Sequence, residues 1–423
     1  MDTIPFHFMM FALDILLLIG FAFLLSWRSA TGKSVSATVY DGLPYISQTN
    51  ISQPAVQPRW SVLVDFFCLG LFGFVGIAGI RIIAKVFDTN KGQCMMEGLT
   101  YHGSIFLLIA ACLLLRKHRI IVAIFSGLLG LLIFGIGFDM LVWEPYHLVV
   151  ENYVIETPKL KKPLKIVFVA DIQTDRIGNY ERRTLKLIQQ QQADLIILGG
   201  DYLQYYQGTQ GVSDLPERFD NLFREIPLTA PLGVYAIEGN IGPNNDLFKN
   251  TGVEMISEST ILENLGTEQG LGPIDLVLLS LNDTAGSVGE RGLTDTGNFI
   301  VMAGHRPNFA IKGFRSQRYP GLDEGYQDAK RAPDLMLAGH THGGQVVLPF
   351  YGPIGLGGDG FVKQIPQNML SGMFTFANGG RLLITRGSGM ERGWAPRIRF
   401  LCKPEISVIH LVPAEKNTGT EFQ

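Results

Sequence analysis

Four long apolar runs in the first third of the chain constrain its fold more than any other feature. They span 5–27, 60–86, 99–115 and 120–142. A helix needs roughly 20 apolar residues to cross a bilayer, and several such runs in succession exceed what the core of a globular protein offers. The sequence therefore predicts an all-α transmembrane domain over 1–143 with about four transmembrane helices, followed by a second domain over 144–423.

The first run and the charges within the runs favour a membrane anchor. The run at 5–27 lacks the short hydrophobic core and the cleavage site of a signal peptide, so we expect a retained helix. Asp14 is costly in hydrocarbon and should face a neighbouring helix. Asp65 and Arg81, in the second run, also allow a transporter or channel as an alternative, but pairing between helices is the simpler account.

Basic residues predict the orientation of the spans, because cytoplasmic loops are enriched in Lys and Arg. The loops after the first span and before the fourth contain Arg28, Lys33, Arg59, Arg116, Lys117 and Arg119. Both loops should be cytoplasmic, and an even number of spans then puts both termini on the other side. We expect a multi-pass protein, in a cell inner membrane, with an extracytoplasmic C-terminal domain. Four lysines after the last span oppose this orientation: Lys159, Lys161, Lys162 and Lys165.

Charge and cysteine content exclude several functions. The net charge is −3 and the chain has no dense Lys/Arg tract, so nucleic-acid binding is not expected. The four cysteines are scattered, without the paired spacing of a zinc ribbon or a disulfide framework.

Polar residues follow a series of short apolar strands after Leu164, and a helical pattern at 180–192 separates the first two strands. The residues at the strand ends are Asp171 with Gln173, Asp201, Asn240, His305, and His340 with His342. Open α/β sheets place their sites at the carboxyl ends of strands. These side chains are therefore candidates for one site.

The segment LMLAGHTHGGQ, at 335–345, carries the strongest single signal. His340 and His342 are two residues apart in a turn whose glycines allow close approach of backbone and ligand. This pattern is typical of a metal site. The alternative, two solvated histidines in a surface loop, does not explain the apolar strand and the three glycines.

The ordered series strongly resembles the calcineurin-like metallophosphoesterase superfamily, whose pattern is D-x-H, GD, GNH[D/E], a later His, and GHTH. The resemblance covers roughly 165–411, and the closing stretch from Thr385 to Leu411 is similar to the membrane-associated bacterial branch of the superfamily. It implies an α/β (α+β) fold, a two-sheet sandwich flanked by helices. It also implies two divalent metal ions that activate a hydroxide for attack on a phosphoester.

The resemblance also implies a role for each strand-end residue. Asp201 would bridge the two metals, the second metal would add Asn240, His305 and His340, and the first would add Asp171 and His342. Asp201, Asn240 and His340 are the residues expected to act in catalysis.

Two positions depart from the family pattern. Gln173 replaces the histidine of D-x-H; its amide oxygen suits Mn²⁺ or Mg²⁺ better than zinc or iron, and Mn²⁺ is favoured. Asp175 could complete this site instead, although a solvated loop carboxylate is the more ordinary reading. Ile241 replaces the histidine of GNH[D/E], which usually contacts the phosphate and helps the leaving group.

Other polar residues have less specific readings. Asn244, Asn245 and Asp246 follow Ile241 closely, and Arg306, Arg386 and Arg392 could contact phosphate or form structural ion pairs. The remaining histidines, namely His7, His102, His118, His147 and His410, lie outside the motifs and are read as structural.

The leading expectation is a membrane-anchored, metal-dependent hydrolase of phosphoesters or diphosphates, with a phospholipid, a lipid diphosphate or another substrate at the bilayer surface. The alternative is a degenerate member that binds metal or phosphate as a sensor or assembly partner. Five intact motif positions favour the enzyme, and the two lost histidines favour the alternative.

Overall fold

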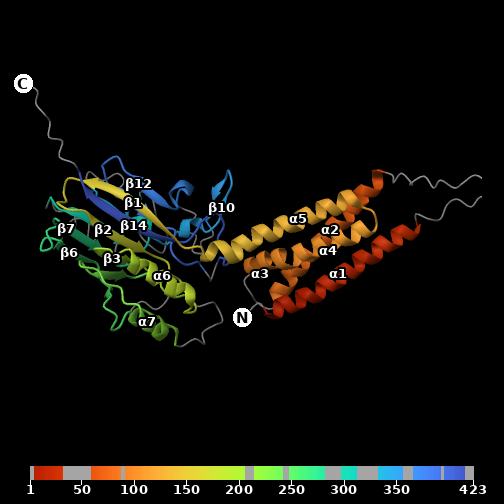
Figure 1. The fold of residues 1–423 in the computed structure, drawn as a ribbon, viewed down its shortest axis with the longest axis horizontal. Helices are drawn as coiled ribbons and strands as arrows, with labels where there is room; N and C mark the ends of the chain where they lie inside the picture. Colours follow the sequence, from red (N-terminus) through yellow and green to blue (C-terminus); the bar gives the residue numbers. More distant parts are fainter. Residues whose placement is uncertain are drawn as a thin grey trace, which may run out of the picture. The chain divides into compact units, whose positions relative to one another are not determined.

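The structure, a computed structural model, describes residues 4–31, 59–86, 91–204, 214–241, 247–281, 297–311, 332–355, 365–391 and 395–414. The chain divides into two compact units, Met1–Phe138 and Asp139–Gln423 (Figure 1).

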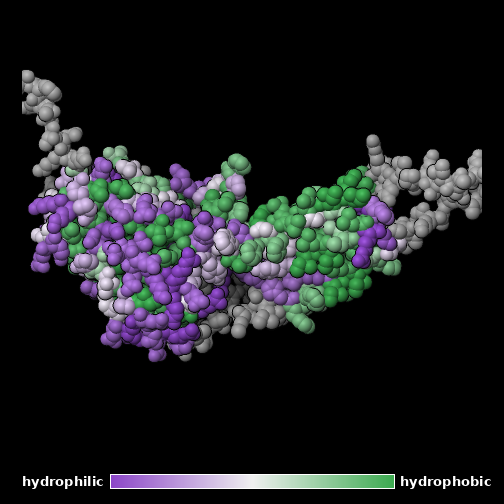
Figure 2. All heavy atoms as spheres, in the orientation of Figure 1, coloured by the Kyte–Doolittle hydropathy of each residue, from purple (hydrophilic) through white to green (hydrophobic). Residues whose placement is uncertain are grey.

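The first unit is helical. Its helices are α1 (Ile4–Thr31), α2 (Arg59–Val86), α3 (Lys91–Glu97), the π-helical turn η1 (Gly98–Gly103), α4 (Ser104–Arg116) and α5 (Ile120–Phe138). Among the residues that the structure describes, four stretches are long and apolar enough to cross a membrane: His7–Ser26, Val62–Ile83, Gly92–Arg116 and Ile120–Tyr146, the last of which ends in the second unit. Large apolar side chains cover the outside of this unit, as expected for helices that face lipid (Figure 2).

Polar residues within these helices contact one another across helices. Asp14 on α1 accepts a hydrogen bond from His102 Nδ1 at 2.6 Å, and the other nitrogen of His102 lies 2.9 Å from His7. Asp65 on α2 lies 3.5 Å from Arg119. The expectation that Asp14 faces a neighbouring helix is confirmed. Pairing removes most of the cost of placing such groups in hydrocarbon.

The second unit contains two six-stranded mixed sheets. The first has the order β1-β14-β2-β3-β4-β5, with bounds Val149–Thr157, Glu405–Pro413, Leu164–Val169, Leu195–Leu198, Val234–Ile237 and Glu254–Ile256. The second has the order β12-β13-β9-β8-β7-β6, with bounds Gly372–Thr375, Arg381–Ile384, Leu335–Ala338, Phe299–Gly304, Ile274–Leu278 and Thr260–Leu265. The predicted fold, a two-sheet sandwich with flanking helices, is confirmed.

Side chains along strands such as β3 and β9 alternate between two buried faces, which explains why these strands are apolar throughout. Leu195 and Ile197 of β3 belong to the core that also contains Leu335 and Leu337 of β9 from the other sheet. Their neighbours on β3 point to the opposite face, where helices α6 (Asn179–Gln190) and α7 (Leu215–Glu225) pack. Strands buried on both faces are apolar throughout, because neither side meets water.

The described part of the second unit also contains short elements. They are η2 (Asp139–Trp143), η3 (Glu144–Tyr146), η4 (Pro307–Phe309), η5 (His342–Gly344), the small hairpin β10 (Val347–Leu348) and β11 (Gly352–Pro353), and η7 (Gln367–Met369). Strand β1 precedes the segment where we expected the sandwich to begin. It pairs in parallel with β14, near the C-terminal end of the described chain.

Candidate metal centre

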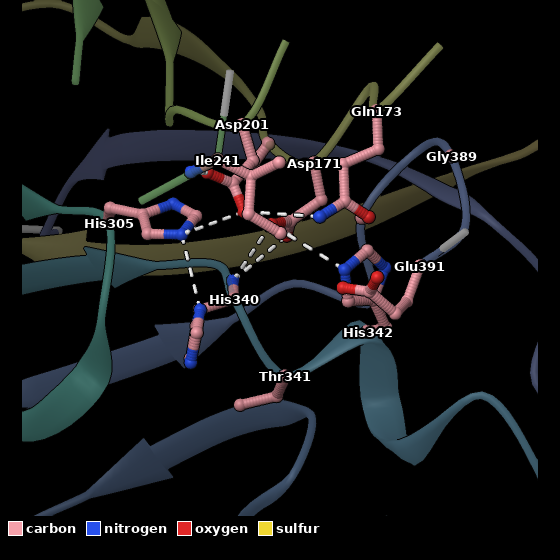
Figure 3. A network of polar contacts seen from close by, with 12 residues as sticks. Asp171, Gln173, Asp201, Ile241, His305, His340, Thr341, His342, Gly389 and Glu391 are labelled. Carbon is pink, nitrogen blue, oxygen red and sulfur yellow. Dashed lines mark hydrogen bonds and ion pairs between the residues drawn. The ribbon is translucent and has the colours of Figure 1, made fainter. Parts of the chain in front are cut away.

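The strand-end residues meet at one edge of the sandwich. In the first sheet β2, β3 and β4 are parallel, so Asp171, Asp201 and Asn240 emerge side by side. In the second sheet β8 and β9 are parallel, and they deliver His305 and His340 to the same place (Figure 3). Segments that are far apart in sequence thus build one buried cluster.

The backbone turns sharply where it delivers these side chains. Asp171 and Asp201 both have φ near +54°, and His340 and His342 have φ of 70° and 50°. Left-handed backbone is disfavoured for residues other than glycine, and such strain collects at functional sites. Hydrogen bonds between the loops hold these turns: Asp171 donates its N–H to the Gly200 oxygen at 3.0 Å.

Four ligand atoms converge on one point. His305 Nε2 lies 2.9 Å from Asn240 Oδ1, 3.3 Å from Asp201 Oδ2 and 3.2 Å from His340 Nδ1. Asp201, His305 and His340 are all buried, and one ligand atom from each lies within 4.8 Å of the others. This is the complete set that the family resemblance assigns to the second metal.

The orientation of His305 fits a cation at this point. Its Nδ1–H donates to the Gly199 carbonyl oxygen at 2.8 Å, which leaves Nε2 directed at the oxygens of Asn240 and Asp201. Acceptor atoms that face one another require a cation between them, either a proton on His305 or a metal ion. Nitrogen and oxygen donors of this kind suit first-row divalent metals.

A looser group lies beside this cluster. The nearest approach between Asp171 and His342 is 3.9 Å, from Oδ1 to Nε2. Gln173 donates from Nε2 to Asp201 Oδ2 at 3.1 Å. The buried atoms Gln173 Oε1 and His342 Nδ1 have no hydrogen-bond partner among the residues that the structure describes. Buried acceptors without partners are costly, so this group also fits a cation, with fewer contacts in place than the first cluster has.

Burial and mutual attraction shift the pKa values of the cluster. Burial raises the pKa of Asp171 to about 7, against the attraction of His305. Burial would also raise the pKa of Asp201, but attraction to His305 and hydrogen bonding with it hold that pKa below its usual value. Burial and the Arg399 guanidinium lower the pKa of His342 well below its usual value, so this imidazole is neutral, as a metal ligand must be.

Glycine is required where the strands approach one another. A Cβ atom on Gly239 would lie 2.0 Å from the Asp201 nitrogen and 2.2 Å from its Oδ1. A Cβ atom on Gly339 would lie 2.8 Å from Asp171 Oδ2. Each glycine therefore lets a carboxylate lie against a neighbouring strand end.

The structure distinguishes among the secondary candidates. The backbone N–H of Ile241 donates to Asp201 Oδ1 at 2.8 Å, so Ile241 orients this carboxylate through its main chain. Asp175 forms an ion pair with Arg397. Arg386 pairs with Glu151 at 2.6 Å and Glu405 at 2.8 Å, which is the structural reading. Asn244, Asn245, Asp246 and Arg392 lie outside the described residues.

Sequence reasoning missed the residue that supports the second histidine. Arg399 is fully buried and donates to the carbonyl oxygens of Gly389 at 2.6 Å and Arg386 at 2.7 Å, and more distantly to that of His342 at 3.4 Å. Its position inside the apolar-rich segment RIRFLC was the available signal, because a buried arginine must be paired or bonded.

Comparisons with known proteins agree with this geometry. Residues 164–344 match the family model described as calcineurin-like phosphoesterase. The uncharacterized metallophosphoesterase YkuE of Bacillus subtilis is 27% identical over 63% of this chain and 87% of its own length. An uncharacterized metallophosphoesterase of Campylobacter jejuni is 24% identical over 62% of this chain and 63% of its own length. Phosphodiesterase YaeI of Escherichia coli is 26% identical over 59% of this chain and 83% of its own length.

The match to this family model, together with the buried Asp/His/His cluster, points to divalent metal binding and to metal-dependent hydrolysis of phosphoesters. The C-terminal domain of this chain therefore belongs to the calcineurin-like metallophosphoesterase superfamily.

Proposed function

We propose that the protein is a membrane-anchored phosphoesterase or diphosphatase that uses two divalent metal ions, with Mn²⁺ favoured. The observation that carries the proposal is the convergence of Asp201 Oδ2, Asn240 Oδ1 and His340 Nδ1 on His305 Nε2. When bound, such ions supply Lewis-acid polarisation of the phosphate and a water of lowered pKa.

The residues of the chain have separable roles in this proposal. Asp201 is oriented by the N–H of Ile241 and lies between the two ligand groups, so it would contribute to both. His305 is held by Gly199, and Asn240 and His340 complete its side of the site. The Ile241 side chain has no proton to give, so a leaving group must depart without help from this position.

We place the hydrolase domain outside the cytoplasm of a cell with an inner membrane. The distribution of Lys and Arg among the loops supports this orientation. The four apolar helices support anchoring in the membrane, and anchoring favours a lipid-linked phosphoester or diphosphate as substrate.

A second candidate function follows from Gln173 and Ile241. In this reading the site binds metal or phosphate with little turnover, and the protein acts as a sensor or assembly partner. The donation from Gln173 Nε2 to Asp201 favours it, because a hydrogen-bond donor lies where the family has an imidazole ligand.

Hydrolysis of bis(p-nitrophenyl) phosphate by the purified full-length chain with added Mn²⁺ separates the two candidates. If the first candidate function is right, the unmutated chain must hydrolyse this compound. Asp201→Asn must abolish the hydrolysis, and the matched control Asp275→Asn must retain it. Asp275 is a buried carboxylate on β7 that accepts hydrogen bonds from Asn264 and Asn298. Metal binding in calorimetry without turnover in the unmutated chain would instead support the second candidate.

A further inference from the structure

The second unit exposes an apolar surface beside the metal centre. This surface, the apolar tip, consists of Leu348, Phe350 and Tyr351 from the β10–β11 hairpin and Leu401 from the closing segment. Phe350 is exposed as fully as in an isolated residue, at 111%, and Tyr351 and Leu401 are 65% and 55% exposed. Figure 2 shows hydrophobic spheres where Figure 1 draws β10.

The backbone holds these side chains outward under strain. Phe350 has φ of 65° and Leu401 has φ of 51°, a region that large side chains rarely adopt. The hairpin is fixed at its base, because Ile354 donates to the Val346 oxygen at 2.9 Å and Gln367 donates to the Pro353 oxygen at 2.8 Å. Ordered apolar residues that are presented in this way mark a surface for contact with a protein or a membrane.

Hydrogen bonds tie the apolar tip to η2 and η3, the last turns of the apolar stretch Ile120–Tyr146. Val347 donates to the Phe400 oxygen at 2.8 Å, which joins the hairpin to the closing segment. Arg399 donates from its backbone N–H to the Met140 oxygen at 3.0 Å, and Cys402 donates to the Glu144 carboxylate. Leu401 lies in the chain between Arg399 and Cys402, the two residues that make the last two bonds.

The last residues of the apolar stretch Ile120–Tyr146 suit a bilayer interface. The stretch has 27 residues, more than the roughly 20 that the hydrocarbon core needs, so part of it extends beyond the core. Trp143 and Tyr146 are exposed there, and these residue types gather at membrane interfaces. Lys403, next to the tip, is also exposed and suits lipid headgroups.

The same segment reaches the metal centre. The Arg399 guanidinium donates to the His342 oxygen at 3.4 Å, and Phe400 donates to the Gln345 oxygen at 3.0 Å. The turns η2 and η3, the apolar tip and the His340–His342 loop are therefore parts of one hydrogen-bonded structure inside the second unit.

We propose that the apolar tip inserts into the bilayer interface and holds the metal centre at the membrane surface, where it takes phosphoesters of membrane-embedded lipids. The occupant of this surface is the lipid bilayer, because the last apolar stretch, Ile120–Tyr146, contains Met140 and Glu144, to which the closing segment of the tip is hydrogen-bonded. The substrate class rests on the proposed function, whereas insertion of the tip does not.

Spin labels on the full-length chain in phosphatidylcholine and phosphatidylglycerol vesicles test the insertion. Phe350→Cys and Leu401→Cys are made with Cys112→Ala, since Cys112 is the exposed cysteine among those described and the other three are buried. Val154→Cys is the control, because Val154 is an exposed apolar residue on β1, roughly 17 Å beyond Val149 along the strand. Labels at 350 and 401 should be accessible to oxygen and shielded from a water-soluble nickel complex, unlike the label at 154. Equal nickel accessibility at all three positions overturns the proposal.

Two substrates with the same leaving group test the substrate class. Phosphatidyl-p-nitrophenol in vesicles is compared with soluble bis(p-nitrophenyl) phosphate. The double variant Phe350→Ser/Tyr351→Ser should lower the ratio of lipid to soluble rates by about tenfold, which corresponds to 1.4 kcal/mol of lost apolar burial, and Val154→Ser should leave the ratio unchanged. An unchanged ratio in the double variant overturns the lipid substrate. Failure of the unmutated chain to hydrolyse either compound refutes the proposed function instead, while the spin labels still decide the insertion.

Discussion

At the scale of single residues, one ligand group is assembled by direct contacts and the other is not. The Gly199 carbonyl fixes the orientation of His305, whose Nε2 lies within 3.3 Å of three further metal-ligand atoms. Asp171 and His342, by contrast, approach only to 3.9 Å. Gln173 belongs to the looser group, and its amide donates to Asp201 where an imidazole would offer a lone pair.

Metal binding should therefore occur in two unequal steps. We expect calorimetry with Mn²⁺ to resolve a tight site at His305 and a weaker site at His342. Gln173→His should strengthen the weaker site by about tenfold or more, because an imidazole binds first-row metals better than an amide oxygen. Two equal affinities in the unmutated chain would contradict this prediction.

Ile241→His tests the missing proton donor. General acid assistance is typically worth about 10² to 10⁴ in rate, and it matters most for strongly basic leaving groups. The unmutated chain should hydrolyse aryl esters and diphosphates well and alkyl phosphates poorly, and the histidine should raise the alkyl rate by the larger factor. If both rates rise equally, another residue supplies the proton, with Asp246 the first to examine.

The raised pKa of Asp171 predicts how this residue makes the stability of the metal-free protein depend on pH. Its folded pKa of about 7 exceeds the ordinary 3.8, so the folded state binds more protons between these values. The contribution of Asp171 to stability is then fully present below about pH 4 and is lost as the pH rises through 7. With EDTA present, the midpoint of thermal unfolding of the unmutated chain should fall by a few degrees from pH 5 to 8 relative to that of Asp171→Asn. The midpoint of Asp275→Asn should fall together with that of the unmutated chain.

At the scale of secondary-structure elements, parallel strands determine where the ligands meet, and close packing of their ends determines how near they come. β2, β3 and β4 end side by side in one sheet, and β8 and β9 do so in the other. Arg399 then ties the closing segment to the loop of His342 through carbonyl oxygens.

Gly239→Ala should disrupt this packing. The added methyl would lie 2.0 Å from the Asp201 nitrogen, so the ends of β3 and β4 must move apart. We expect a loss of metal affinity and at least about a tenfold loss of hydrolysis, because small displacements of catalytic groups are costly. Gly178→Ala is the control, since its added atom would lie no nearer than 3.4 Å to other atoms. A Gly239→Ala enzyme with the unmutated rate would show that this contact is not limiting.

At the scale of the whole molecule, the chain joins a unit of apolar helices to a phosphoesterase domain. The two units differ in what their surfaces face. The helices expose large apolar side chains such as Phe23 and Phe74, whereas the described residues after 146 expose few, and the apolar tip is the main cluster among them.

The Lys and Arg bias predicts the side of the membrane on which the second unit lies. Alkaline phosphatase fused after Gln423 should be active, because it matures only outside the cytoplasm, and a reporter that is active only in the cytoplasm should be silent there. The reverse pattern would mean that an odd number of spans, or the lysines at 159–165, decides the orientation.

The sequence by itself determined the classes of element and most of the residues that come together. Apolar runs of membrane length specify helices because every backbone polar group must be bonded internally in lipid, and strand-end polar residues converge because parallel strands end at one edge. These regularities are local or periodic, so they can be read without coordinates.

Only the tertiary structure decided which candidates touch and what supports them. Asp175 pairs with Arg397, Arg386 pairs with two glutamates, and Gln173 donates to Asp201; each outcome depends on contacts between residues distant in sequence. The hydrogen bonds of the Arg399 guanidinium, and those from the Arg399 and Cys402 backbone to Met140 and Glu144, likewise arise from packing. A sequence pattern fixes which groups are available, but the burial and distances that set their charge states and partners exist only in the folded chain.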